Sequence, residues 1–281
     1  MRKKILILCA DDFGLSPGIN NGILELLRKR RLSAVSCMAI SNNLRDYKEE
    51  LFSHSVYTDI GLHLVLTSLP RLGPNTSIAQ NGQFGNLNNL VKKSLTLRLS
   101  RTDLATEIKC QINRFFDVFN KPPDFIDGHH HVHQLPVIRD VLLDVISEGG
   151  YEKAPYLRVT HDRMLNILCR NVAVTRAFFI GSLGAAFKRR AFRKGFEVNN
   201  GFSGIYNFSD VIPYADLFKK FITGIKSGAM VMCHPGYNDE ELSSVDSLTQ
   251  QRKNELDFFS GPLFLELLEN QNIELGRFSK T

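Results

Sequence analysis

The sequence predicts an α/β fold: a single-domain (β/α) barrel over residues 1–281, either complete or irregular and incomplete. Short β-rich apolar runs alternate with longer segments of helical period, which indicates a mostly parallel sheet with helices outside it. The length of 281 residues lies within the range that such a barrel fills as one unit. With 43% hydrophobic and 23% charged residues, the composition also allows a large core.

The first helix is expected over residues 17–31, because Pro17 stands at its start and Ile19, Ile23 and Leu26 recur on one face. The strongest helical pattern covers residues 102–120, which Pro122 and Pro123 follow. The other expected helices are 43–52, 135–148, 210–226 and 261–270. The expected strands are 5–10, 34–40, 59–66, 124–127, 156–160 and 229–233. Residues 69–89, rich in Pro, Gly and Asn, are expected to form a long loop.

The apolar runs and cysteines predict a cytoplasmic protein. No run approaches the roughly 20 residues that a membrane span needs. The run at residues 5–10 ends in Asp11-Asp12, so it is too short for a signal peptide and is better explained as a strand. The five cysteines are scattered and form no C-x-x-C pair, which argues against disulfides and against a thiolate zinc site.

One segment is strongly basic. Residues 153–195 hold ten Lys and Arg against a single acidic residue, Asp162, so the segment carries +9 while the rest of the chain carries −3. The basic, Phe-rich region 163–195 suggests contact with an anionic or membrane surface. The alternative is an outer helix that is simply solvated. Nucleic acid is not expected as a partner, because no recognition motif accompanies the charge.

Polar residues gather at the ends of the expected strands. Asp11 and Asp12 follow the first strand, His63 ends the third, the run 127–133 follows the strand at 124–127, and His234 follows the last. Arg158 lies on the strand at 156–160. In parallel α/β folds this edge is where active sites are assembled.

Asp and His without thiolates suit a catalytic metal site that keeps a position open for water. One of Asp11 and Asp12 can bind metal while the other accepts a proton; the alternative is that the pair caps the following helix. In an extended chain, His129, His131 and His133 would share a face, so spacing alone does not select the ligand. His234 suits a general acid on the opposite wall. Zinc fits a His₂Asp site, and magnesium remains an alternative.

With these residues laid out, the chain resembles the YdjC-like carbohydrate deacetylases, the family that includes chitooligosaccharide deacetylase and hopanoid-associated deacetylases. The matching segments are Ala10–Ser16, Gly61–Thr67, Ile126–His133, Met232–Gly236 and the stretch from Arg252 to Leu256. The resemblance implies a barrel related to polysaccharide deacetylases. It further implies Asp11 as the catalytic base and Asp12, His63 and His129 as ligands of one divalent metal cation. An acid role for His234 is our own inference.

The expected function is therefore metal-dependent removal of an acetyl group from an N-acetylated amino sugar, oligosaccharide or glycolipid. Gly128 and the region 163–195 depart from the family pattern, which suggests a larger or lipid-linked glycan as substrate. Arg252 and Glu255, at i and i+3 on a helix, are expected to form an ion pair.

Three alternatives stay open at this stage. The first is a metal-dependent phosphoesterase on the same barrel edge, supported by the basic segment. The second is a glycosidase using Asp11 and Asp127, which would leave the histidines without a purpose. The third is a glycan-binding protein without activity. A homodimer is compatible with the sequence.

Overall fold

The computed structural model describes residues 3–74, 76–209, 211–246 and 248–281. Its main sheet is parallel throughout and follows the order β7-β6-β3-β2-β1-β9-β8, with β10 pairing β1 as well. The strands are β1 (Lys4–Phe13), β2 (Ala34–Cys37), β3 (Asp59–Leu64), β6 (Phe125–Gly128), β7 (Tyr156–Leu157), β8 (Phe202–Ser203), β9 (Ala229–Cys233) and β10 (Ile273–Leu275). The predicted α/β fold is confirmed, as a curled half-barrel rather than a closed barrel.

The long central strand β1 organises the sheet. Its first residues pair with β10 on one side, and its last residues pair with β2 on that side, while β9 lies along the other. Apolar side chains of β1 are buried on both faces, as expected for a parallel sheet covered by helices. The register to β2 shifts between Ala10 and Phe13, which places a bulge at the two aspartates.

The two edges of the half-barrel meet through residues 197–203. Val198 forms an isolated bridge with Leu157, and Phe202 pairs with Met230. Between these points the side chain of Asn199 acts as a strand partner. Its Oδ1 accepts from the Val159 N–H at 2.7 Å, and its Nδ2 donates to the Val159 carbonyl at 2.9 Å. A short strand and one buried amide therefore span the open side of the barrel.

Replacing Asn199 with alanine is expected to lower the free energy of unfolding by about 2–4 kcal/mol, because each buried backbone group left unpaired costs about 1–3 kcal/mol. Urea denaturation measures the change. Asn200→Ala is the matched control, since the Asn200 side chain is exposed and bonds only to the Ser227 carbonyl among the described contacts. Equal losses in the two variants would show that Asn199 does not hold the edges together.

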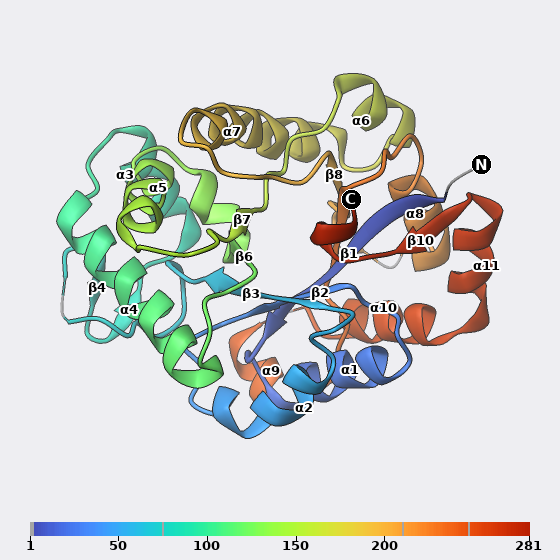
Figure 1. The fold of residues 1–281 in the computed structure, drawn as a ribbon, viewed down its shortest axis with the longest axis horizontal. Coiled ribbons are helices and arrows are strands. Elements are labelled where there is room, and N and C mark those ends of the chain that lie inside the picture. The colour runs from blue at the N-terminus through green and yellow to red at the C-terminus, as the bar shows by residue number, and fades with distance from the viewer. Residues whose placement is uncertain (1–2, 75, 210, 247) are drawn as a thin grey trace.

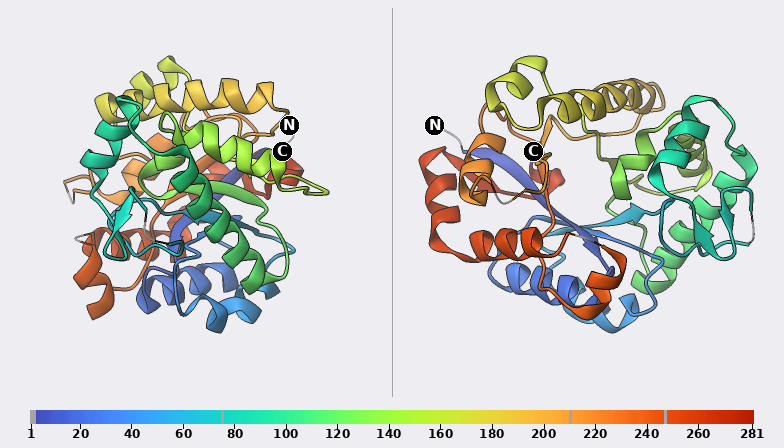
Figure 2. Two further views of the ribbon diagram at one scale, coloured as in Figure 1. Left: turned by 90° about the vertical axis from the view of Figure 1, so that its left-hand side faces the viewer. Right: turned by 180° about the vertical axis from the view of Figure 1, so that it is seen from behind.

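Helices lie around the sheet (Figures 1 and 2). In the view of Figure 1, α6 and α7 lie at the top, α3, α4 and α5 at the left, α8 and α11 at the right, and α1, α2, α9 and α10 at the bottom. The helices are α1 (Pro17–Arg28), α2 (Lys48–Ser53), α3 (Leu87–Leu95), α4 (Arg101–Phe119), α5 (Ile138–Glu148), α6 (Met164–Arg170), α7 (Val174–Arg193), α8 (Tyr214–Phe221), α9 (Glu240–Val245), α10 (Gln250–Ser260) and α11 (Pro262–Asn270). Three 3₁₀ turns complete the described elements: η1 (Leu44–Tyr47), η2 (His129–Gln134) and η3 (Phe278–Lys280).

Several sequence predictions differ from this arrangement: the strands expected at 34–40 and 156–160 end at Cys37 and Leu157, and the helix expected at 43–52 is η1 followed by α2. The expected loop at 69–89 contains a hairpin of β4 (Ala79–Gln80) and β5 (Gln83–Phe84), and α3 begins within it. Its Asn86 caps α3 by accepting from the Asn89 N–H. The helix expected at 210–226 is shorter, because Pro213 precedes α8 and Gly224 follows it; position 210 lies outside the described residues.

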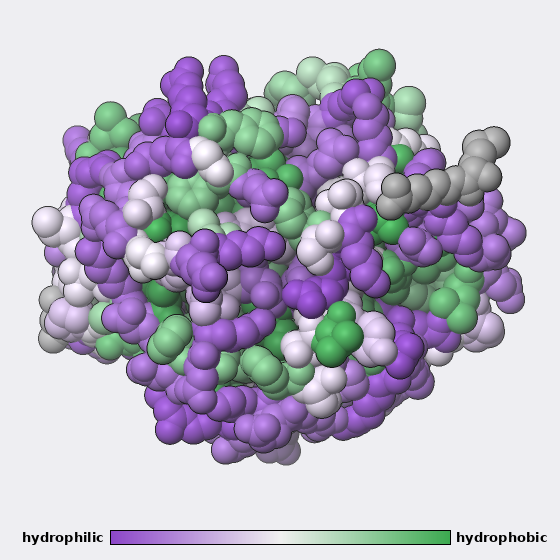
Figure 3. Space-filling model, in the orientation of Figure 1, coloured by the Kyte–Doolittle hydropathy of each residue, from purple (hydrophilic) through white to green (hydrophobic). Residues whose placement is uncertain are grey.

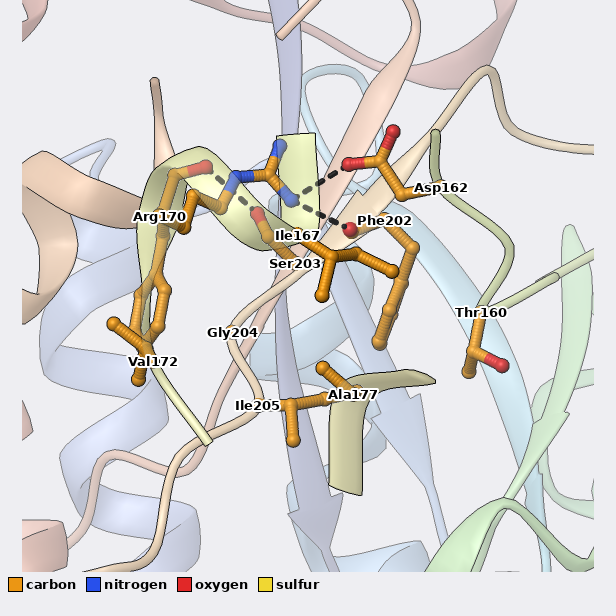
Figure 4. A pocket seen from close by; sticks show the side chains of 11 residues that line it. Thr160, Asp162, Ile167, Arg170, Val172, Ala177, Phe202, Ser203, Gly204 and Ile205 are labelled. Atoms are coloured by element: carbon orange, nitrogen blue, oxygen red, sulfur yellow. Dashed lines mark hydrogen bonds and ion pairs between the residues drawn. The ribbon is translucent and has the colours of Figure 1, made fainter. Parts of the chain in front are cut away.

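The basic segment forms α6 and α7, and several of its charges are neutralised. Arg170 is buried, pairs with Asp162 at 2.6 Å and donates to the Phe202 carbonyl at 3.2 Å, so it ties α6 to β8 (Figure 4). Arg190 pairs with Asp140 and Lys194 with Asp144, both on α5. The face seen in Figure 3 is mostly hydrophilic, with hydrophobic side chains in separate patches. Among the described helices, none has the length and apolarity to cross a membrane.

Candidate active site

The carboxyl end of β1 directs its two aspartates to different partners. Both carboxylates are buried; Asp11 faces Arg158, and Asp12 faces His63, His129 and Arg252. Asp12 has φ +68°, a left-handed conformation that non-glycine residues rarely adopt and that is often found at functional sites. Neither aspartate caps α1, because Ser16 is its N-cap and accepts from the Ile19 N–H. The capping alternative is therefore excluded.

Asp12, His63 and His129 form a compact set of metal-ligand atoms. Asp12 Oδ1 lies 3.3 Å from His63 Nε2 and 3.1 Å from His129 Nδ1, and one ligand atom from each residue lies within 4.8 Å of the others. The residues come from the ends of β1, β3 and β6, which neighbouring pairings bring to one edge. Two imidazoles and a carboxylate suit a divalent transition metal such as zinc, so this donor set fits a cation.

The His63 ring is fixed from behind. Its Nδ1 donates to Asp127 Oδ1 at 2.7 Å, and Ser36 Oγ donates to the same oxygen at 2.5 Å. Burial alone would lower the pKa of His63, but Asp127 and Asp12 raise it to about 10. A carboxylate behind a histidine orients the ring and makes it a stronger ligand. Asp127 therefore has a supporting position that the sequence reasoning did not assign.

Arg252 takes part in the site, and the predicted ion pair with Glu255 is wrong. Its Nη2 donates to Asp12 Oδ2 at 2.6 Å and to Asp246 at 2.6 Å. Helix α10 turns Glu255 instead toward Tyr206 and the His234 backbone N–H, each at 2.6 Å. Arg252 thus leaves Asp12 Oδ1 free to face the two histidines.

Asp11 is held by a bidentate ion pair. Arg158, fully buried, donates to its two oxygens at 2.6 and 2.5 Å and also reaches Asp127 at 2.5 Å. Burial would raise the pKa of Asp11, but the guanidinium outweighs it and holds that pKa well below its usual range. Asp11 is therefore ionised at neutral pH, with both of its oxygens bonded to Arg158.

The histidine run is not extended, because His130 and His131 both adopt left-handed conformations within η2. Only His129 of the run lies in the ligand set. His130 contacts Thr67, the His131 ring packs on Phe202, and His133 Nε2 donates to the Arg158 carbonyl at 2.9 Å. The extended conformation in which His129, His131 and His133 would share a face is therefore not the one the chain adopts.

His234 lies on the other side of Asp11. Its Nε2 is 4.0 Å from Asp11 Oδ2, its backbone is anchored by Glu255, and its ring packs edge-on against Phe208. Burial lowers the pKa of His234 to about 4, so the ring is neutral at pH 7. Cys233 beside it is buried and its thiol contacts the Cys9 carbonyl, in keeping with an inert core cysteine.

A second group of ligand-type atoms, from Cys9, Asp11 and Asp127, lies next to the first. Arg158 fills it: its Nη2 contacts both carboxylates and lies 3.0 Å from Cys9 Sγ. The guanidinium therefore already provides the positive charge that these groups need.

The site opens into a cavity of about 640 Å³. Its floor is the strand edge with Asp11, Asp12, His63, His129 and His234. All five sequence-predicted site residues thus line one cavity. Its walls come from α3, α7 and the loops near Leu69, Phe208 and Asp246.

Acidification is expected to destabilise the fold partly through His133. Burial lowers its pKa from 6.5 to about 4, so between these pH values the unfolded chain takes up a proton that the folded chain does not. Stability is therefore lost as the pH falls, by about 3 kcal/mol from this residue. Urea unfolding at pH 7 and pH 4 measures the drop in the free energy of unfolding between the two pH values. This drop is expected to be about 3 kcal/mol larger in the wild type than in His133→Gln. Parallel losses would mean that the folded ring carries a proton.

The chain is similar to a known family and to several named proteins. A family model described as YdjC-like protein matches residues 5–270. Proteins named chitooligosaccharide deacetylase from Yersinia pestis (strain Pestoides F) and Yersinia pseudotuberculosis serotype O:1b (strain IP 31758) are 28% identical over 279 residues, covering 98% of this chain and 98% of theirs.

Two solved structures share the fold. A protein of Enterococcus faecalis V583, described as a candidate cellobiose-phosphate cleavage protein, superposes with a TM-score of 0.73 at 20% identity, over 99% of this chain and 98% of that one. The Bc1960 peptidoglycan N-acetylglucosamine deacetylase gives a TM-score of 0.50 at 9% identity, over 99% of this chain and 87% of that one.

Proposed function

Because the chain belongs to the YdjC-like family, we propose that it is a hydrolase that removes the acetyl group from an N-acetylated amino sugar or a glycoconjugate containing one. The observation that carries the proposal is the set of Asp12, His63 and His129, flanked by Asp11 and His234 on the floor of one cavity. The full-length relatives named chitooligosaccharide deacetylase support the same reaction.

Asp12, His63 and His129 would hold one divalent cation, zinc or magnesium. Such a cation would polarise the acetamide carbonyl and lower the pKa of a water molecule in the site. Asp11 is ionised and accepts a proton from the attacking water. Arg158 keeps both oxygens of Asp11 in place, and Asp127 and Arg252 orient His63 and Asp12.

The proton then moves toward the leaving amine. His234 Nε2 and Asp11 Oδ2 lie 4.0 Å apart, so the two groups flank a common space in the cavity. His234 is neutral at rest; it takes up the proton that Asp11 has removed and donates it to the sugar nitrogen as the C–N bond breaks. Water and the acetamide are thereby converted to acetate and the free amine.

Acetate release tests the proposal. The substrates are N-acetylglucosamine, its oligomers and lipid-linked N-acetyl sugars, each with and without zinc or magnesium. Asp11→Asn is expected to lower kcat by about 10²–10⁴-fold, the usual contribution of a general base. Asp257→Asn, an exposed carboxylate on α10 paired with Lys253, is the control.

Metal-dependent release that Asp11→Asn abolishes supports deacetylation. No release from any substrate while metal is bound would overturn the proposal and favour phosphoester hydrolysis. No metal binding at all would favour a glycan-binding protein.

A further inference from the structure

The cavity has a polar floor, and its walls are apolar along α3 and α7. On α7, Phe179, Ile180 and Leu183 line it at i, i+1 and i+4, with Arg176 one turn earlier. On α3, Leu87 and Val91 line it at i and i+4. Leu69 and Leu135 lie in the lining as well. Two helices therefore present apolar side chains to the cavity, and Leu87, Val91 and Leu183 also pack against the core.

These walls are poorly suited to additional sugar rings. A pyranose carries a hydroxyl group on most of its carbons, and each one buried against Leu, Ile or Val without a hydrogen-bond partner costs free energy. An alkyl chain loses no hydrogen bonds there and removes apolar wall from water. The polar groups of α3 and α7 in the lining are limited, among the described residues, to Arg176.

The size of the cavity and the exposure of its walls also favour an apolar group as the ligand. At about 640 Å³ the cavity is large enough to enclose a ligand of drug size, for which roughly 300–1,000 Å³ is typical. Phe179 is 51% exposed at the cavity rim although it is a large aromatic. Exposed apolar side chains that line a cavity mark a binding surface for an apolar group.

We propose that the natural substrate is an amphiphile: an N-acetylated amino sugar linked to an alkyl or acyl chain, with the chain lying between α3 and α7. This inference rests on the proposed function. The acetamide group lies on the floor beside Asp12 and His234, and Arg176 at the N-terminal end of the α7 stripe is placed for a polar or anionic linker. The alkyl or acyl chain of the substrate contacts Phe179, Leu183 and Val91.

The test compares methyl and octyl β-glycosides of N-acetylglucosamine, with the octyl compound below its critical micelle concentration. Each buried CH₂ is worth about fourfold in binding, so three or four of them give the octyl glycoside about a 100-fold higher kcat/KM. Phe179→Ser and Val91→Ser are expected to reduce this ratio about tenfold. Phe192→Ser is the matched control, because Phe192 lies on the same helix, is 56% exposed and does not line the cavity.

A second measurement is independent of turnover. In saturation-transfer NMR with metal-free protein, the terminal methyl group of octyl glucoside is expected to receive magnetisation in the wild type and in Phe192→Ser, and much less in Phe179→Ser. Equal kcat/KM for the two glycosides would overturn the inference while leaving deacetylation intact. An octyl preference that neither wall variant reduces would overturn it too. If the octyl group binds but no substrate releases acetate, the proposed function is overturned, and this substrate class with it.

Discussion

Replacing Arg158 with methionine is expected to lower the free energy of unfolding by about 3–5 kcal/mol, since breaking a buried ion pair leaves uncompensated charge. The guanidinium is fully buried between Asp11 and Asp127, and methionine would leave both carboxylates without it. Asp127 is fully buried on β6 and does not line the cavity, so its carboxylate would keep an uncompensated charge.

Urea denaturation at pH 7 measures this loss. Arg190→Met is the control: Arg190 forms an ion pair with Asp140 on the surface, where such pairs contribute about 0–1 kcal/mol. Adding Asp127→Asn to Arg158→Met is expected to recover part of the loss, because one of the two stranded charges is removed. If the double variant is no more stable than the single one, charge burial is not the cause.

Replacing Asp12 with alanine is expected to abolish tight binding of zinc. The set would keep only two imidazoles, and Arg252 would lose its partner on β1 while retaining Asp246. Asp127→Asn acts one step further away, through the hydrogen bond to His63. Loss of such an outer partner typically weakens metal affinity about 10–100-fold.

Competition with a chromophoric chelator measures both affinities. Asp162→Asn is the control, because Asp162 is a buried carboxylate paired with Arg170 but far from the set in the contacts described. Zinc affinity is expected to be highest in the wild type and Asp162→Asn, lower in Asp127→Asn and lowest in Asp12→Ala. Unchanged zinc affinity in Asp12→Ala would show that Asp12 on β1 is not a zinc ligand.

The parts of the site that could be predicted are those encoded locally. Strands such as residues 229–233 and their polar carboxyl ends are visible as short apolar runs followed by Asp or His. Parallel pairing then gathers these ends at one edge, which is why Asp12, His63 and His129 were expected together. The family motifs supplied the roles that spacing alone left open.

The supporting residues could not be predicted in the same way. Arg252 and Asp12 are 240 positions apart, and Arg158 and Asp11 are 147 apart, so no local pattern relates them. The stretch from Arg252 to Leu256 matched the family without a role for Arg252, and the ion pair expected from the local i, i+3 rule gave way to the tertiary partner on β1. The signal available for Arg158 was a charged residue within the short strand expected at 156–160.

Backbone conformation caused the remaining differences. His130 and His131 both adopt the left-handed conformation, which is uncommon outside glycine and which no sequence pattern in the run indicates. Gly128 allows this close turn: a Cβ there would lie 3.0 Å from His133 Nδ1. The start of α3 likewise lies at the end of the stretch 69–89, whose Pro, Gly and Asn content predicted only loop.

The junction made by Asn199 has an evolutionary consequence. Residues 161–196, which include α7 and its cavity wall, lie outside the sheet after β7, and the chain returns at a seam where the Asn199 side chain bonds the Val159 backbone and Val198 bridges Leu157. Insertions or deletions in that excursion would leave the strand register and the aspartates and histidines of the floor untouched. Selection could therefore exchange one substrate tail for another by remodelling this excursion, while the hydrolytic chemistry is inherited unchanged.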